Sequence, residues 1–289
     1  MNILRILVAV GVLALAGKAN GQTLTNLYSF TGQADGGYPV SGLIQGSDGN
    51  FYGTTLEGGW RPSWGTVFRI SPGGTLTTLY MFNGPYGDPS DGAFPNSGLV
   101  QGNDGNFYGT TFRGGTGPSA ADDGCGIVFR VSPSGVETNL YSFPYYVNGG
   151  FPTAGLVQGY DGNFYGTTES GGAYAYSGGD FGTVFRISPS GVLTTLYSFS
   201  NSPSDGAVPS YSGLIQGSDS NFYGTTAGSL QPCIVLSLKP TGICPMADWF
   251  REPTAIFMGR QPGVERMAGT ERSFGSVRAV TSPVSGHSV

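Results

Sequence analysis

The residues best suited to chemistry are five acids that lie outside the repeated words of the sequence: Glu57, Asp122, Asp123, Glu169 and Asp180. Two carboxylates at a set separation are enough for glycoside hydrolysis. The one histidine, His287, lies near the C-terminus, which leaves no Ser-His-Asp or Cys-His triad and no histidine-based metal site for the rest of the chain. Solvated loop acids are the simpler interpretation. We therefore expect a non-catalytic protein without cofactor or metal; a carboxylate-dependent, glycosidase-like carbohydrate-active enzyme is the alternative.

Four aromatic side chains also lie outside the repeated words: Trp60, Trp64, Tyr174 and Tyr176. Exposed aromatics on loops that a rigid scaffold holds are typical of carbohydrate or protein recognition. The acids and aromatics fall in residues 56–64, 112–125 and 169–181, where the repeated units differ in length and content. This pattern predicts ligand contact by these four aromatics, in an extracellular binding or interaction module. Packing over a sheet edge is the competing interpretation.

The chain is built from repeated units. QGSDGNFYGTT at residues 45–55 returns as QGNDGNFYGTT at 101–111, QGYDGNFYGTT at 158–168 and QGSDSNFYGTT at 216–226. A unit that packs against copies of itself needs the same residues every time, so the repetition indicates architecture. Each unit holds four stretches with the two-residue period of a strand, which in the first unit are SGLIQGSDG, NFYGTT, GTVFRISP and TLTTLYMF.

Both faces of each predicted sheet carry apolar residues, so each sheet must be covered on both sides. Small four-stranded sheets that pack face to face around an axis, as in a β-propeller, meet this need. We predict an all-β propeller of four four-stranded blades over residues 22–240. The N-terminal TLTNLYSF at residues 23–30 resembles a fourth strand without partners. Its pairing with the strand that contains Val235 would close the ring; an open arc of a larger propeller is the alternative.

Two loop motifs recur between the predicted strands. Asp-Gly at 48–49, 104–105 and 161–162 predicts two-residue hairpin turns, and a single Asp per turn supplies too few oxygens for calcium. DGGYP at 35–39, DGAFP at 91–95, NGGFP at 148–152 and DGAVP at 205–209 predict the crossovers between blades. The phenylalanine of each repeated word is expected at a packed interface between sheets: Phe51, Phe107, Phe164 and Phe222.

The fourth unit departs from the others after its NFYGTT word. Aligning CIVLSLKP with GTVFRISP places Cys233 where Gly65 stands, Leu236 where Phe68 stands and Ser237 where Arg69 stands. This predicts a weakly packed fourth blade. Cys233 and Cys244 are close in sequence and are the candidate disulfide, with two free thiols as the alternative. Cys125 would then be a buried or a reactive thiol.

The ends of the chain and its composition limit its location and partners. Residues 1–21 combine a basic residue, a short apolar run and small residues, as in a secretory signal peptide; we expect a secreted or cell-surface protein with no membrane span after cleavage. The net charge is −5 and the repeats have no basic face, which excludes a phosphate-tracking nucleic-acid binder. Residues 241–289 lack the repeated words, and we expect them to form a poorly ordered tail. We expect a monomer.

The unit GLIQGSDGNFYGTT followed by GTVFRISPGGTLTTLYMF resembles the tandem repeat of the GloVer-containing (Gloeo_Verruco) secreted bacterial proteins, the choice-of-anchor group. The resemblance covers residues 23–240. It implies an exported or surface-anchored repeat protein and defines no biochemical activity. The tail has no apolar span, unlike the anchoring segment of longer members, so anchoring is not implied for this chain.

Overall fold

The computed structural model describes residues 25–59, 63–88, 90–117, 123–175, 180–202, 206–209, 213–227 and 233–236. The chain divides into two units, Met1–Cys244 and Pro245–Val289, and all described residues belong to the first. The predicted signal peptide and tail lie outside the described residues. No helix within the described ranges is both long and apolar enough to cross a bilayer.

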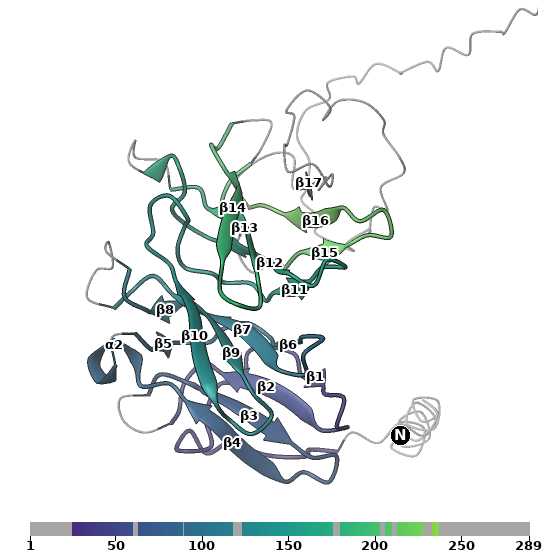
Figure 1. Ribbon diagram of the computed structural model, residues 1–289. Coiled ribbons are helices and arrows are strands. Elements are labelled where there is room, and N and C mark those ends of the chain that lie inside the picture. Colours follow the sequence, from purple (N-terminus) through teal and green to yellow (C-terminus); the bar gives the residue numbers. More distant parts are fainter. Residues whose placement is uncertain are drawn as a thin grey trace, which may run out of the picture. The chain divides into compact units, whose positions relative to one another are not determined.

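The described chain forms successive antiparallel sheets, each with its strands in sequence order (Figure 1). The first sheet holds β1 (Ile44–Gln45), β2 (Phe51–Thr55), β3 (Thr66–Ile70) and β4 (Leu76–Met81). The second holds β6 (Val100–Gln101), β7 (Phe107–Thr111), β9 (Ile127–Val131) and β10 (Glu137–Ser142). The third holds β11 (Val157–Gln158), β12 (Phe164–Thr168), β13 (Thr183–Ile187) and β14 (Leu193–Ser198). The prediction of an all-β fold with four-stranded sheets is confirmed.

The remaining elements are shorter. Within the described residues, a fourth sheet has three strands, β15 (Ile215–Gln216), β16 (Phe222–Thr225) and β17 (Cys233–Leu236). The short strands β5 (Gly92–Ala93) and β8 (Arg113–Gly114) pair with one another, and α2 (Gly84–Gly87) is a single helical turn.

Both faces of the central strands are buried, as the sequence pattern predicts. In β3 every residue except Arg69 is buried, and Arg69 is half-buried. β9 and β13 repeat this pattern. Alternate residues of a strand point to opposite faces, so these sheets are covered on both sides by neighbouring parts of the chain.

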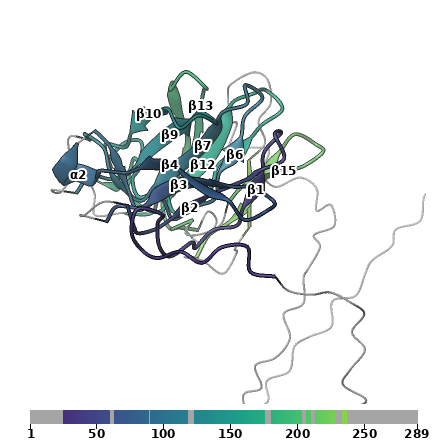
Figure 2. The same cartoon turned by 90° about the horizontal axis from the view of Figure 1, so that it is seen from below.

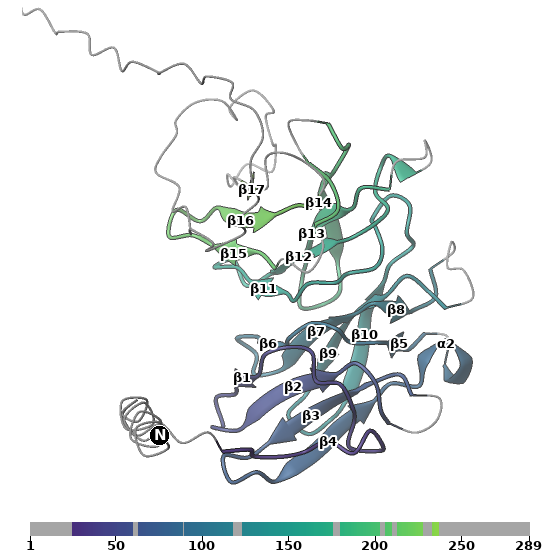
Figure 3. The ribbon, with the colours of Figure 1, turned by 180° about the vertical axis from the view of Figure 1, so that it is seen from behind.

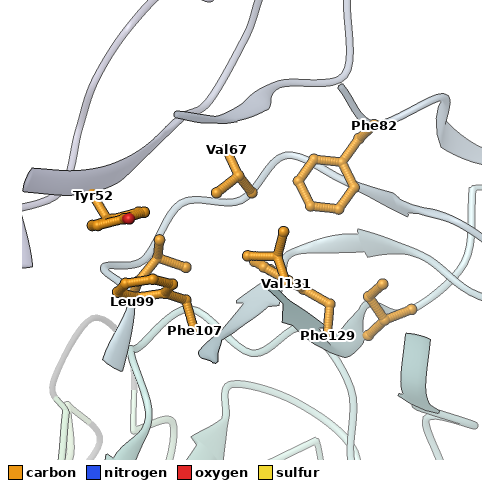
Figure 4. Packing of buried hydrophobic residues seen from close by; sticks show 8 residues of the cluster. Tyr52, Val67, Phe82, Leu99, Phe107, Phe129 and Val131 are labelled. Atoms are coloured by element: carbon orange, nitrogen blue, oxygen red, sulfur yellow. The ribbon is translucent and has the colours of Figure 1, made fainter. Parts of the chain in front are cut away.

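Aromatic stacks join neighbouring sheets at nearly constant geometry. Tyr52 stacks on Phe107 at 3.8 Å and 24°, and the stack of Tyr108 on Phe164 measures 4.0 Å and 27°. The third stack, between Tyr165 and Phe222, measures 4.0 Å and 28°. Figure 4 shows the first of these interfaces, with Tyr52, Val67 and Phe82 facing Leu99, Phe107, Phe129 and Val131.

The prediction that the repeated phenylalanines are buried is confirmed for Phe107, Phe164 and Phe222. Phe51 is only half-buried. The physical reason is its position: the other three each stack on a tyrosine of the preceding sheet, whereas no described sheet precedes the first. Phe51 therefore lies on a face that the described residues do not cover completely.

The described residues do not show the predicted closure of the ring. β17 pairs with β16, and residues 25–30 are in no strand, so their pairing with the strand that contains Val235 stays a prediction.

The sequence alignment of β17 with the third strands of the other sheets is wrong by two residues. Phe222 pairs with Leu236 and Thr225 with Cys233, which puts Leu236 in the place of Ile70 and Cys233 in the place of Val67. An even shift keeps every side chain on its face, so the sequence pattern fits both registers.

The Asp-Gly segments are turns, but the two-residue hairpin is wrong. The loop runs over residues 46–50, where the Gly46 N–H donates to Asn50 O at 2.8 Å. Asp48 accepts hydrogen bonds from the Asn50 side chain at 2.7 Å and from the Tyr52 hydroxyl at 2.8 Å. The bond from Asn50 contributes most to lowering the pKa of Asp48. Asp104, Asp161 and Asp219 make the same two bonds, so these carboxylates hold their own turns.

Candidate binding surface

The loops that vary between repeats gather at one end of the sheets, which we call the crossover end. In the first three sheets the crossover loop pairs there with the loop between the second and third strands of the sheet it enters. Gly37 bridges to Glu57, β5 pairs with β8, and Gly150 bridges to Ser170. Figures 1 and 3 show α2, β5 and β8 on the side away from β1, β6 and β15, and Figure 2 shows the same separation of α2 from β1 and β15.

One residue in each crossover loop has a left-handed backbone, although it is not glycine. These residues and their φ angles are Tyr38 (54°), Phe94 (58°), Phe151 (55°) and Val208 (54°). The Phe94 N–H donates to Trp64 O at 2.8 Å, and Phe94 O accepts from the Phe112 N–H at 3.0 Å. Phe94 thus joins the loops of two sheets. A strained backbone of this kind costs about 1–3 kcal/mol and persists where its surroundings hold it, so the crossover end is a rigid scaffold.

Arg113 lies on β8, which pairs with β5 of the crossover loop. Its guanidinium carbon is 5.6 Å from the ring centroids of both Phe112 and Phe151. Its Nη1 is 3.5 Å from Oδ2 of Asp123, and both side chains are about a third exposed. A cation over an exposed aromatic face is attracted by about 0.5–1 kcal/mol. The two rings therefore hold the guanidinium in place while part of its donor edge faces solvent.

Tyr145 and Asp180 form the adjoining part of this surface. The Tyr145 hydroxyl donates to Asp180 Oδ2 at 2.7 Å, while Asp180 Oδ1 accepts from the Gly171 N–H. The Tyr145 ring contacts Phe151 edge-on at 5.9 Å. Burial, and then the hydrogen bond to Asp180 and its charge, raise the pKa of Tyr145 to about 12, so Tyr145 is a neutral donor at physiological pH. We call Phe112, Arg113, Tyr145, Phe151 and Asp180 the Arg113 cluster.

Comparison with known families decides where the chain belongs. The profile of the Gloeobacter/Verrucomicrobia repeat family matches residues 16–231. The chain belongs to this family. The resemblance that the sequence motifs carried is therefore confirmed. No curated protein matches the chain significantly in sequence.

Several solved structures are similar to this family member at low sequence identity. One is the extracellular domain of a one component system from B. thetaiotaomicron, with 12% identity, a TM-score of 0.44 and coverage of 68% of this chain and 21% of that one. The extracellular domain of a hybrid two component system from the same organism has 15% identity, a TM-score of 0.41 and coverages of 67% and 20%. A luciferin-regenerating enzyme has 14% identity, a TM-score of 0.39 and coverages of 64% and 53%. The chain spans about a fifth of the length of the two B. thetaiotaomicron structures.

The aromatic residues predicted to bind ligand have different positions in this repeat protein. Trp64 is half-buried, packs against the core between the first two sheets and contacts Phe94 edge-on at 5.1 Å, in line with the packing interpretation. Tyr174 is 44% exposed at the crossover end. Trp60 and Tyr176 lie outside the described residues. Ligand binding by these four residues stays a prediction.

The candidate acids separate into distinct places. Glu57 is exposed on the loop of the first sheet, and Asp122 lies outside the described residues. Asp123 contacts Arg113. Burial raises the pKa of Glu169, and the charge of Asp180 raises it further.

Sequence reasoning missed Arg113, Phe112, Phe151 and Tyr145. A signal was present, because Arg113 is the second residue after a repeated word, where the first and third units have Glu57 and Ser170. The contact with Phe151 was not visible, because it needs the crossover loop of the next repeat.

The cysteines contribute no described reactive group. Cys125 is a free, buried thiol, and burial raises its pKa. Thiolate is the nucleophilic form, so Cys125 is the buried rather than the reactive thiol. Cys244 and the side chain of Cys233 lie outside the described residues, and their disulfide stays a prediction.

A further acid, Glu137, occupies a place that the repeat gives to leucine. Glu137 pairs with Val131 as Leu76 pairs with Ile70 and Leu193 with Ile187. Among the described residues its Oε1 is buried without a hydrogen-bond partner. Burial, and then the charges of Asp91 and Asp88, raise its pKa from 4.5 to about 8. The native state therefore favours the protonated form of Glu137.

Replacing Glu137 with leucine is expected to stabilise the protein in a pH-dependent way. A raised native pKa means that stability is lost as pH rises from 4.5 to about 8. Near pH 4 the variant and the wild type should be close in stability, and near pH 8 the variant should be more stable by about 1–2 kcal/mol, a value discounted for partial exposure. Urea unfolding across this pH range measures the difference in unfolding free energy between the variant and the wild type. For Glu137→Gln this difference should also increase with pH. A gap independent of pH would contradict the assignment.

Proposed function

We propose that this protein is a secreted, non-catalytic binding module in which the four sheets are blades of a propeller and the crossover end contacts an extracellular ligand. One observation carries the proposal: the loops of the crossover end place charged and aromatic side chains around Arg113, on a scaffold that repeated backbone bonds hold rigid. A surface that served only packing would have no need of the non-repeated charged groups Arg113 and Asp180. The secretory signal predicted from residues 1–21 supports an extracytoplasmic location.

The chemistry of the Arg113 cluster favours carbohydrate as the ligand. Sugars present apolar C–H faces that stack on aromatic rings and hydroxyl edges that need donors and acceptors. Tyr174 supplies an exposed ring, and the partly exposed edge of Arg113 supplies donors. Protein recognition uses the same residue types and is the other ligand class.

A glycan array probed with the purified secreted chain tests the proposal. Tyr174→Ala and Arg113→Ala are expected to weaken binding about 5- to 30-fold, the effect of losing 1–2 kcal/mol. The matched control is Tyr160→Ala, because Tyr160 is a 74% exposed aromatic in an Asp-Gly turn, at the opposite end of the sheets. Its binding should equal that of the wild type. Loss of binding in the Tyr160 variant would contradict the location, and no bound glycan would contradict the ligand class.

A carboxylate-dependent carbohydrate-active enzyme is the second candidate, because the raised pKa of Glu169, to which the charge of Asp180 contributes, resembles that of the acid of a glycosidase pair. The binding module is favoured because Asp180 already accepts bonds from Tyr145 and Gly171. Release of reducing sugar from a polysaccharide panel decides between the two. We expect none, and release that Glu169→Gln abolishes would establish the enzyme instead.

A further inference from the structure

Neighbouring sheets are joined by a repeated contact surface. Among the described residues, the first sheet has no sheet packed before it and the fourth has none packed after it. Each sheet presents a leucine to the sheet before it and an isoleucine or valine to the sheet after it. Leu99, Leu156 and Leu214 pack in this way on the preceding sheet, and Ile44, Val100 and Val157 on the following one. We call the surface of the first sheet at Leu43, Gln45 and Phe51 the leading face. The surface of the fourth sheet at Ile215, Ser218 and Tyr223 is the trailing face.

The leading face is open. Leu43 is 51% exposed, whereas Leu99, the equivalent leucine of the second sheet, is 8% exposed. A Cβ placed on Gly98 or Gly155 would lie 3.5 or 3.2 Å from the oxygen of the corresponding glycine in the preceding sheet, but one placed on Gly42 would meet nothing within 4 Å. No described sheet therefore covers this surface.

The trailing face is open in the complementary way. Ile215 is 68% exposed, whereas Ile44 is half-buried against the next sheet. Tyr223 is half-buried, whereas Tyr52 and Tyr108 are fully buried by their stacks on the following phenylalanines. Among the described residues Tyr223 has no stacking phenylalanine, and the equivalent of that partner is Phe51.

The N-terminal segment identifies the kind of sheet that fits the leading face. The backbone oxygen of Leu27 is 2.6 Å from a Cβ placed on Gly74. The oxygens of Leu79 and Leu140 lie at the same distance from a Cβ placed on Gly135 and on Gly191. Phe30 contacts Phe68 edge-on at 5.0 Å, as the terminal phenylalanines of the first two sheets contact theirs at 5.2 and 5.3 Å. Residues 27–30 thus occupy the place of the fourth strand of a preceding sheet. The incoming sheet must lack that strand, and within the described residues the sheet β15-β16-β17 has three strands.

The packing geometry decides whether this sheet comes from the same chain. The three tyrosine-phenylalanine stacks differ by only 0.2 Å and 4°, so the same aromatic contact recurs at each of the three interfaces. These three interfaces do not bring Gly213 within 4 Å of a Cβ on Gly42. The leading and trailing faces therefore do not meet at these glycines within one copy, whereas a second copy can dock with the same aromatic contact.

We propose that the trailing face of one copy packs on the leading face of a second copy, whose residues 25–30 lie as the missing fourth strand beside β17. Tyr223 then stacks on Phe51 of the other copy. The Ser218 N–H donates to Gln45 Oε1, as the Ser47 N–H donates to Gln101 Oε1 within one chain at 2.9 Å. Such a contact is heterologous and forms closed rings or open chains of copies. This inference is independent of the ligand at the crossover end.

Two single substitutions test it, because each blocks one face at an exposed position. Leu43→Lys blocks the leading face and Ile215→Lys the trailing face, and neither side chain is needed for folding of one copy, since both are more than half exposed. Mass measured by light scattering under reducing conditions should show two or more copies for the wild type and one copy for each variant. The control Val192→Lys changes an equally exposed apolar side chain in the turn before β14 and should keep the wild-type mass.

Mixing the two variants in equal amounts separates a second copy from closure within one chain. The Leu43→Lys chain keeps its trailing face and the Ile215→Lys chain keeps its leading face. The mixture should therefore form a two-copy species that neither variant forms alone. A wild type with the mass of one copy, or a mixture that stays at one copy, would overturn the proposal. Circular dichroism of each variant confirms that it is folded.

Discussion

Replacement of Phe107 with alanine is expected to lower the free energy of unfolding by about 3–5 kcal/mol. Phe107 is fully buried and stacks on Tyr52 in the core that joins the first two sheets. The substitution removes the ring from both sheets and leaves a cavity that the close-packed surroundings fill only in part. Urea unfolding at a protein concentration too low for association of copies measures the loss.

The matched control is Phe51→Ala. Phe51 has the same place in the repeat as Phe107 but is half-buried, with no described sheet before it. Its loss of unfolding free energy should be less than half of that for Phe107→Ala, because hydrophobic stabilisation is proportional to the apolar area removed from water. Equal losses at the two positions would contradict the assignment of Phe107 to an interface between sheets.

Replacement of Gly126 with alanine is expected to lower stability by at least about 3 kcal/mol, combining left-handed strain with overpacking. The φ of Gly126 is +95°, and a Cβ there would lie 2.4 Å from Thr111 O and 2.7 Å from Pro152 Cδ. Neither neighbour is the end of a flexible side chain. Pro152 is the last residue of the crossover loop into the third sheet, so the clash would disturb the entry of the chain into that sheet.

Gly105→Ala separates strain from collision. Gly105 has a φ of +79°, and a Cβ there would meet nothing within 4 Å. Its replacement should cost only the left-handed strain, about 1–2 kcal/mol. If Gly126→Ala does not fold, circular dichroism will show an unfolded Gly126→Ala beside a folded Gly105→Ala, which still ranks the two effects. Equal effects would mean that Thr111 and Pro152 move aside freely.

The strands and their order could be predicted from the sequence because two signals coincide in them. In Thr66, Phe68 and Ile70 the two-residue period marks a strand, and the fixed spacing of the words marks where each strand recurs. The register of β17 could not be predicted, since a shift of two residues keeps Cys233 and Leu236 on the same faces. Composition indicates a turn at Asp48-Gly49, but the five-residue loop follows from the bonds of Asp48 to Asn50 and Tyr52.

The Arg113 cluster could not be predicted for a different reason. The three loops were identified from their variation between repeats, which names candidate residues and not their contacts. Arg113 becomes a fixed group only because Phe151 arrives from the next crossover loop, and Tyr145 meets Asp180 across 35 residues of sequence. Such contacts depend on how two successive sheets are packed, which a one-dimensional pattern does not contain.

The most direct test of the account is the hydrogen-exchange footprint of a glycan that the array identifies. If the crossover end binds ligand, protection should appear in residues 112–117 and 169–175, around Arg113 and Tyr174, and should disappear in the Arg113→Ala variant. The opposite end, at the Asp-Gly turn that carries Tyr160, should exchange at the same rate with and without ligand. Protection centred on the Asp-Gly turns, with the crossover end unchanged, would contradict the account.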